Sequence, residues 1–283
     1  MIVLARFAIR EALRRRVFTV VAWLTAAFLV LYGLGVWQAF KIAGDLGSGF
    51  SADPDTVVGA TMFGLAIFGT LFLGVVLAVF LTLGTIRGDA ERGLLQPLLV
   101  RGGRDRMRRD VLVSRLLSAG GVSALYVLAV YLGALVITGA IGGWWPSDPV
   151  GPALQLMLAV VVITALSLAG SVLLSATANG IAVFMAFGAG LTAGLLGQIG
   201  DAFNSGTLST VADVASYLLP FEALYQSALG DLVQSTTGFD RFVLQLGPLG
   251  GEQNGGPLLW LWALAYLAGV TAIAVRRFKR ADL

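Results

Sequence analysis

Long apolar runs alternate with short polar and charged stretches along this chain. Six runs reach or approach the roughly 20 residues that a helix needs to cross the hydrocarbon core of a bilayer, and Arg115 is the only charged residue inside them. This pattern predicts an all-α polytopic membrane protein, with six transmembrane helices in a single domain that covers residues 1–283. The expected spans are residues 17–37, 57–86, 111–141, 153–175, 180–200 and 257–275.

The fourth and fifth runs are separated by almost no polar sequence. Residues 153–200 are too long for one crossing, and we therefore expect a hairpin whose turn lies at Asn179-Gly180, a pair that is typical of turns. Three hydroxyl residues of the fourth run, Thr164, Ser167 and Ser171, recur at helical spacing and share one face. Small hydroxyl residues on one face are typical of helix–helix contacts in membranes, which favours a packing surface over a ligand site.

Composition supports the membrane assignment and excludes several kinds of chemistry. The chain is 57% hydrophobic and only 12% charged, with a mean hydropathy of +0.86, whereas a soluble globular chain is about a quarter charged. It has no Cys and no His, so it offers neither a disulfide or thiolate site nor the commonest metal ligand. We expect no metal site and no bound cofactor in this chain.

The lysines bear on whether the chain can hydrolyse ATP. Hydrolysis through a phosphate-binding loop needs a Lys that follows a glycine-rich turn. The only two lysines, Lys41 and Lys279, each follow a Phe, and neither can belong to such a loop. We therefore expect that this chain is not an enzyme.

Basic residues gather at alternate ends of the expected spans. If the N-terminus is cytoplasmic, residues 1–16, 87–115 and 276–283 lie on the cytoplasmic side, and they contain 17 of the 19 Lys and Arg residues. Membrane proteins generally carry such an excess of basic residues in their cytoplasmic loops. We therefore expect a multi-pass protein of the cell (inner, cytoplasmic) membrane with both termini in the cytoplasm.

The N-terminal segment is expected to lie on the membrane surface. Arg6, Arg10 and Arg14 recur every four residues and share one helical face, which favours an interfacial helix on the cytoplasmic leaflet over residues 1–16. A signal peptide is disfavoured, because the apolar run that follows is too long and lacks a clear small-residue cleavage site.

Two long segments are expected on the external side. Residues 38–56 are polar and rich in glycine, and they are predicted to form a loop. Residues 201–256 are predicted to form a helical external region, in which residues 208–219 and 221–229 are mostly apolar and Pro220 separates them. Two short helices that dip into the outer leaflet fit this pattern, and so does a helical cap that rests on the membrane.

The most heavily charged segment is residues 87–110, between the second and third expected spans. It carries seven arginines and four acidic residues. Four of its leucines share one arc of a helix: Leu94, Leu95, Leu98 and Leu99. The segment is therefore either an amphipathic, basic helix beside the membrane or a solvated loop that follows the positive-inside bias.

Residues 89–104, DAERGLLQPLLVRGGR, resemble the cytoplasmic loop of ABC-2 type (type V) ABC transporter permeases. Loops of that family carry an acidic residue, a Gly-Thr-Leu, a Leu-Leu pair, and then a Pro and a basic residue. Here Leu94 stands where the family usually has Thr, Gln96 stands where Glu is frequent, and Gly102 lies near the usual Pro. Pro97 is an additional helix breaker.

The resemblance extends over nearly the whole chain, including the Leu-Leu-Pro at residues 218–220 and the ending RRFKRADL at residues 276–283. In size and layout the chain is most similar to the NosY-like permeases. The resemblance implies an all-helical half-transporter that pairs with a second permease subunit, either an identical copy or a close paralogue. It also implies two copies of a separate ABC ATPase, which would bind the ATP and Mg.

In such a transporter, residues 87–110 would contain a cytoplasmic coupling helix that docks on the ATPase. Within it we expect Glu91 and Arg101 to fix the ends and the four leucines to form an apolar face that is buried in the ATPase, or else to rest on the lipid headgroups. The expected contact residues are Glu91, Arg92, Gly93, Leu94, Leu95, Leu98, Leu99 and Arg101.

Three functions are weighed. The first is the membrane subunit of an ABC exporter. The second is an ATPase-driven membrane scaffold or mechanical coupler, which acts on an external or periplasmic protein through residues 201–256 without passing a solute. The third is an ion-coupled secondary carrier, which is disfavoured because the spans hold no ionisable residue except Arg115. We expect contact with membrane lipids and none with nucleic acid.

Overall fold

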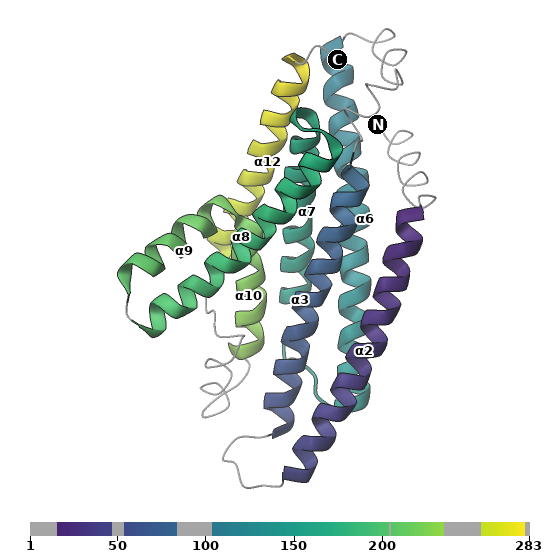
Figure 1. The fold of residues 1–283 in the computed structure, drawn as a ribbon, viewed down its shortest axis with the longest axis vertical. Helices are drawn as coiled ribbons and strands as arrows, with labels where there is room; N and C mark the ends of the chain where they lie inside the picture. The colour runs from purple at the N-terminus through teal and green to yellow at the C-terminus, as the bar shows by residue number, and fades with distance from the viewer. Residues whose placement is uncertain (1–15, 47–53, 84–103, 204, 235–255, 281–283) are drawn as a thin grey trace.

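The computed structural model describes residues 16–46, 54–83, 104–203, 205–234 and 256–280, and these residues are almost entirely helical (Figure 1). The interfacial helix predicted over residues 1–16 lies outside the described residues, apart from Arg16. The helices of the described part are α2 (Arg16–Leu46), α3 (Pro54–Thr82), α6 (Arg104–Gly142), α7 (Val150–Leu173), α8 (Ala176–Ala202), α9 (Gly206–Leu218), α10 (Pro220–Gln234) and α12 (Gly256–Arg280).

Six helices in the described residues are long and apolar enough to cross a membrane: α2, α3, α6, α7, α8 and α12. They coincide with the six predicted spans, and the chain is a multi-pass membrane protein. Helix α6 is the longest, with 39 residues. At about 1.5 Å of rise per residue, it is far longer than the roughly 30 Å of hydrocarbon that a span must cross.

Helix α2 continues past the predicted end of the first span. It reaches Leu46, so the first part of the expected loop over residues 38–56 is helical. The Nζ atom of Lys41 lies 5.5 Å from the centre of the Trp37 ring, one turn earlier on the same helix. Lys is itself a good helix former, so the helix continues past the end of the apolar run.

The fourth and fifth spans form the expected hairpin, but the turn lies elsewhere. Helix α7 ends at Leu173 and α8 begins at Ala176, so the predicted turn residue Asn179 lies inside α8. Its side chain is fully buried, and Asn179 Nδ2 donates to the carbonyl oxygen of Ser167 at 2.9 Å. The turn prediction was wrong because this Asn joins two helices instead of reversing the chain.

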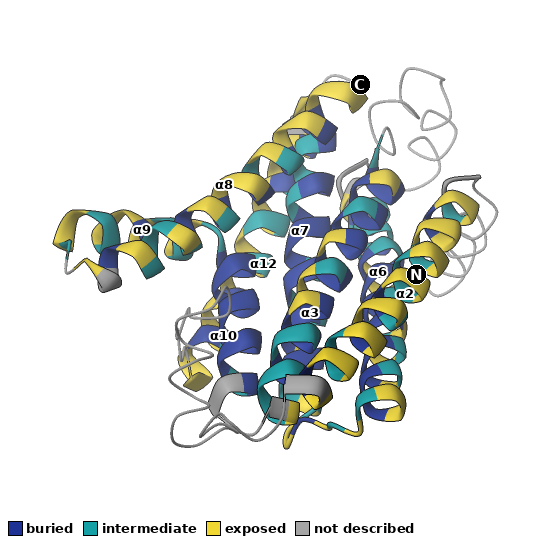
Figure 2. Ribbon diagram, turned by 60° about the horizontal axis from the view of Figure 1, so that its bottom comes forward, coloured by how far each residue is buried: buried dark blue, intermediate teal, exposed yellow. Residues whose placement is uncertain are grey.

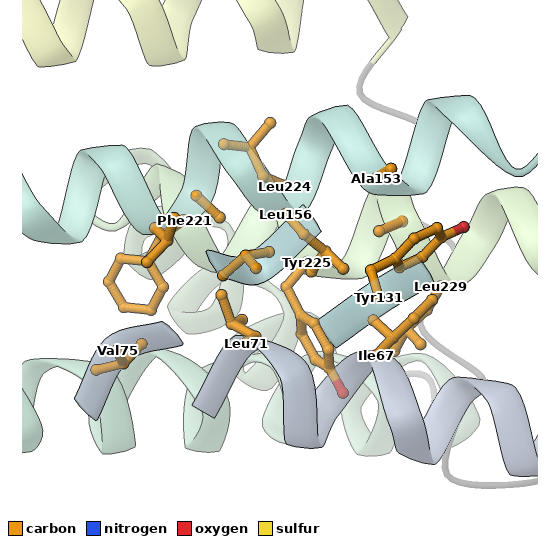
Figure 3. Close-up of a cluster of buried hydrophobic side chains, with 14 of the residues drawn as sticks. Ile67, Leu71, Val75, Tyr131, Ala153, Leu156, Phe221, Leu224, Tyr225 and Leu229 are labelled. Atoms are coloured by element: carbon orange, nitrogen blue, oxygen red, sulfur yellow. The ribbon is translucent and has the colours of Figure 1, made fainter. Parts of the chain in front are cut away.

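Helix α7 occupies the centre of the bundle and contacts α3, α6, α8, α10 and α12. Its apolar sequence is buried on most sides, as expected of a helix that is hydrophobic all round. Figure 3 shows part of this core, where Leu156 of α7 belongs to one cluster with Leu71 of α3, Tyr131 of α6 and Leu224 of α10. Helix α2 lies at the edge with an exposed apolar outer face (Figure 2), which suits contact with lipid.

The segment between the last two spans contains two further helices, separated by Pro220. Helix α9 runs back along α8, and α10 then turns into the bundle and packs against α7, α3 and α12 (Figures 1 and 2). Proline is well tolerated at the first position of a helix, so Pro220 ends one helix and begins the next. Most of α10 is buried, including Phe221, Leu224 and Leu229. Helix α10 is therefore part of the core.

Candidate functional site

The residues that the resemblance assigns to an ATPase contact, Glu91, Arg92, Gly93, Leu94, Leu95, Leu98, Leu99 and Arg101, lie outside the described residues. The flanking helices show where that segment leaves and re-enters the bundle. Helix α3 ends at Thr82 and α6 begins at Arg104. Figure 1 shows these two ends on the same side of the bundle as the first turn of α2 and the last turn of α12. The helices that adjoin the three basic stretches thus end together.

A groove of about 480 Å³ lies between α6 and α12 toward this end. Arg109 of α6 and Arg276 of α12 take part in its lining, and the rest is almost entirely apolar. Such a groove is chemically suited to an anionic lipid, with its headgroup near the arginines and its chain along the apolar wall. The other lining residues are Val113, Leu264, Leu267, Ala268, Thr271, Ala272 and Val275.

A group of buried polar side chains joins α7 to α10. The Gln155 side chain, which is only 5% exposed, donates from Nε2 to Ser227 Oγ and to Asp231 Oδ2, both at 3.0 Å. Asp148 lies beside them, just before α7. Its Oδ1 atom accepts two backbone N–H groups at the start of α7, at 3.0 and 3.2 Å, which satisfies donors that a helix N-terminus leaves unpaired.

A second polar group lies at the start of α10, where Glu222 and Gln226 are four residues apart on one helical face. They are 2% and 5% exposed, and Glu222 is hydrogen bonded to Gln226 and to Ser216 of α9. The carboxyl group lies against Gly194 of α8. A Cβ atom at Gly194 would collide with Glu222 Oε1 and would lie 2.6 Å from Gln226 Nε2. Glu222 reaches this position only because residue 194 has no side chain.

Aromatic rings surround the start of α10. The Phe221 ring stacks on Phe187 of α8, with centroids 5.9 Å apart, and Tyr225 meets Phe68 of α3 edge-on at 6.3 Å. Helices α3, α7, α8, α9 and α10 contain no Lys or Arg. The Glu222 carboxyl group therefore lies among helices that carry no basic side chain.

Burial raises the pKa of both acidic side chains of α10, Glu222 and Asp231. This helix is not one of the six spans. Burial raises the pKa of Glu222 to about 7, although hydrogen bonds to Gln226 and Ser216 lower that pKa. It also raises the pKa of Asp231, which the hydrogen bond from Gln155 lowers and the charge of Asp148 raises further. Acidic groups with strongly perturbed pKa values are found preferentially at functional sites.

The hydroxyl residues predicted on one face of the fourth span form a packing surface, as expected. Ser167 Oγ pairs with Thr82 Oγ1 of α3 at 2.6 Å and also lies beside the Asn179 amide of α8. Thr164 and Ser171 each donate to a backbone carbonyl of their own helix at 2.7 Å. The contacts of Ser167 join α7 to α3 and α8, and all three hydroxyl residues are buried.

Sequence reasoning missed the buried acid. The argument against an ion-coupled carrier counted ionisable residues only within the six apolar runs, and Glu222 lies outside them along the chain. In space, α10 places Glu222 among the spanning helices, so that count was incomplete. The helical spacing of Glu222 and Gln226 was a signal, but spacing alone does not distinguish a buried polar face from a solvated one.

The chemistry that these polar groups offer is that of hydrogen-bond acceptors. Among the described residues, no group of three or more His, Cys, Asp or Glu side chains could hold a metal ion. Three buried oxygens of these two polar groups have no hydrogen-bond partner among the residues that the structure describes: Gln155 Oε1, Glu222 Oε1 and Gln226 Oε1. Buried polar atoms without a partner are uncommon in folded proteins and often mark a functional site.

No protein-family model matches this sequence, and no curated protein matches it either.

Proposed function

We propose that this chain is the transmembrane permease subunit of an ABC transporter, an exporter in the cell membrane that is driven by a separate ATPase subunit. One observation carries the proposal. The charged segment of residues 87–110, which resembles an ABC-2 coupling loop, joins α3 to α6 at the end of the bundle where the other basic stretches also attach. An ATPase that docks on this segment would lie at the end of the bundle that holds the first turn of α2 and the last turn of α12.

The bundle offers a physical route from that end into the membrane. Helix α6 is continuous from Arg104 to Gly142 and packs against α2, α3 and α7, so a force on its first turn acts on the whole helix. In a dimer of such subunits, closure of the ATPase would open and close a cavity at the subunit interface. The cargo would be lipidic or weakly polar, because the exposed faces of the spans are apolar.

The proposal is tested by purifying the full-length, tagged chain from its native membrane. We expect a second permease subunit and an ABC ATPase to co-purify, and the complex to hydrolyse ATP. The isolated chain is expected to hydrolyse none, because neither lysine can form a phosphate-binding loop. Steady ATP hydrolysis by the isolated chain, or solute flux through it that an ion gradient drives without ATP, would contradict the proposal.

A mechanical coupler is the second candidate, and one observation favours it. Helices α8 and α9 form an arm that extends to one side of the bundle (Figure 1), and Val211, Val214 and Tyr217 of α9 are exposed on it. An ATPase-driven movement of α8 would move this arm. In sealed vesicles an exporter passes solute or lipid in proportion to ATP hydrolysis, whereas a coupler hydrolyses ATP without net flux.

A further inference from the structure

Glu222 is a buried acid whose surroundings do not suit a negative charge. A carboxylate that leaves water for a low-dielectric interior is strongly destabilised unless it is paired with a basic group. Helices α3, α7, α8, α9 and α10 carry no Lys or Arg, and the hydrogen-bonding neighbours that the structure gives Glu222 are the neutral side chains of Gln226 and Ser216. Tyr225 lies near enough to interact with it electrostatically, and the backbone of α8 approaches it at Gly194.

The carboxyl group also has an unused oxygen at a fixed place. Glu222 Oε1 faces the gap at Gly194 and, among the described residues, has no hydrogen-bond partner; Gln226 Oε1, one turn further along α10, has none either. Two buried acceptors without donors are costly to leave unpaired. A proton on Glu222 removes the buried negative charge.

We propose that Glu222 is a proton-binding site that couples the packing of α10 against α8 to pH. The carboxyl group holds a proton while α10 is docked at Gly194. When this contact opens and water enters, the O–H bond breaks and the proton passes to water, which leaves a solvated carboxylate. The proposal does not depend on whether an ATPase drives the chain.

The other titratable groups near Glu222 do not account for its proton. Residues 176–200 of α8 and all of α7 contain no ionisable side chain. Helix α9 contributes the exposed side chains of Asp213 and Tyr217, and α12 contributes Tyr266 before its basic last turn at residues 276–280. Helix α3 has only Asp55 in its first turn. On α10 itself, Tyr225 adjoins Glu222, and Asp231 lies about two and a half helical turns away.

A proton suits this place better than a metal cation. A sodium or calcium ion is held by several converging oxygens, but the Gln226 amide presents its Nε2 hydrogens to this region. The described residues offer no second carboxylate there. A proton binds to one oxygen of the Glu222 carboxyl group and needs no second carboxylate.

Infrared difference spectroscopy on the full-length protein in lipid nanodiscs tests the proposal, with spectra recorded between about pH 5 and pH 9. The C=O stretch of a protonated carboxyl group absorbs in an infrared range separate from that of the carboxylate. The chain has no His and no Cys, so it lacks the side chains that ordinarily titrate near neutral pH. The variants are Glu222→Gln, the matched exposed control Asp213→Asn on α9, and Asp231→Asn, which removes the other shifted acid of α10.

We expect a carboxyl band that disappears as the pH rises through neutrality in the wild type, in Asp213→Asn and in Asp231→Asn, and that is absent from Glu222→Gln. A band that persists in Glu222→Gln, or that vanishes in Asp231→Asn, would overturn the assignment. So would a band that Na⁺ displaces at constant pH, because the site would then be a cation site.

A second variant tests the proposal even if Glu222→Gln does not fold. Replacing Gln226 by Leu removes a hydrogen bond that lowers the pKa of Glu222, so the midpoint of the band should move to higher pH. An unmoved midpoint in Gln226→Leu, or the absence of any titrating carboxyl band in the wild type, contradicts the proposal without reference to Glu222→Gln.

Discussion

Glu222 of α10 occupies the space that a side chain at Gly194 of α8 would need. The contact joins two helices that belong to different parts of the sequence, the fifth span and the helix after Pro220. Because both sides are tightly packed, an added methyl group cannot be accommodated without moving α10, Glu222 or Gln226.

We therefore expect Gly194→Ala to destabilise the protein by about 1–3 kcal/mol, as overpacking of a filled interior usually does. Gly188→Ala is the matched control, since Gly188 lies on the same helix and a Cβ atom there would meet nothing within 4 Å. The control should be neutral or slightly stabilising. The apparent melting temperature in detergent reports the difference, and equal values for both variants would show that the Glu222–Gly194 contact is not tight.

The amide of Asn179 is expected to hold α7 and α8 together. Its side chain is fully buried and donates to the carbonyl oxygen of Ser167, so Asn179→Ala removes a buried hydrogen bond and should cost about 1–3 kcal/mol. Thr177→Ala, an exposed position in the same turn, should change the melting temperature little. A melting temperature of Asn179→Ala that matches that of Thr177→Ala would refute the role.

Stability should depend on pH through Glu222. Its pKa rises from the ordinary value of 4.5 to about 7 in the folded protein, so within this window the folded state binds more protons than the unfolded state. Stability therefore decreases as the pH rises through the window, by up to ~3 kcal/mol above neutral pH. We expect the melting temperature to fall between about pH 5 and pH 8 in the wild type and to change much less in Glu222→Gln. A parallel fall in both proteins would assign the effect to other groups.

The proposed orientation can be tested because the chain has no Cys. Single cysteines are introduced by Arg104→Cys at the start of α6 and by Ser147→Cys, an exposed position between α6 and α7. A membrane-impermeant maleimide should label the Ser147→Cys variant in intact cells and the Arg104→Cys variant only in inverted vesicles. Labelling of the Arg104→Cys variant from outside would overturn cytoplasmic placement of residues 87–110.

The helices themselves could be predicted from the sequence, because an uninterrupted apolar run of membrane length has few alternatives. Their ends were less well predicted. Helix α2 runs on to Leu46 through Lys41, and the predicted turn at Asn179 is a buried contact inside α8. At Asn179 a contact with another helix, through Ser167, outweighs the turn signal of the Asn-Gly pair. At Lys41 the end of the apolar run did not mark the end of the helix.

The buried polar site could not be predicted, because it depends on where α10 lies. Apolar and polar residues alternate along residues 220–234 at helical spacing, which equally describes an amphipathic helix on the membrane surface. Only the packing of α10 against α7 and α8 shows that Glu222 and Gln226 face protein. The predicted coupling residues stay a prediction, since residues 84–103 lie outside the described part of the chain.

The central claim, that residues 87–110 couple this chain to an ATPase, is tested most directly by replacing Leu98 and Leu99 with Asp. Each leucine buried in a docking groove would contribute about 1.5–3 kcal/mol, so we predict that this variant still inserts and dimerises but loses the co-purifying ATPase and its coupled activity. Val100→Asp, on the opposite side of the same predicted helix, should retain both. An ATPase that co-purifies undiminished with the Leu98→Asp, Leu99→Asp variant, with its activity intact, would contradict the account.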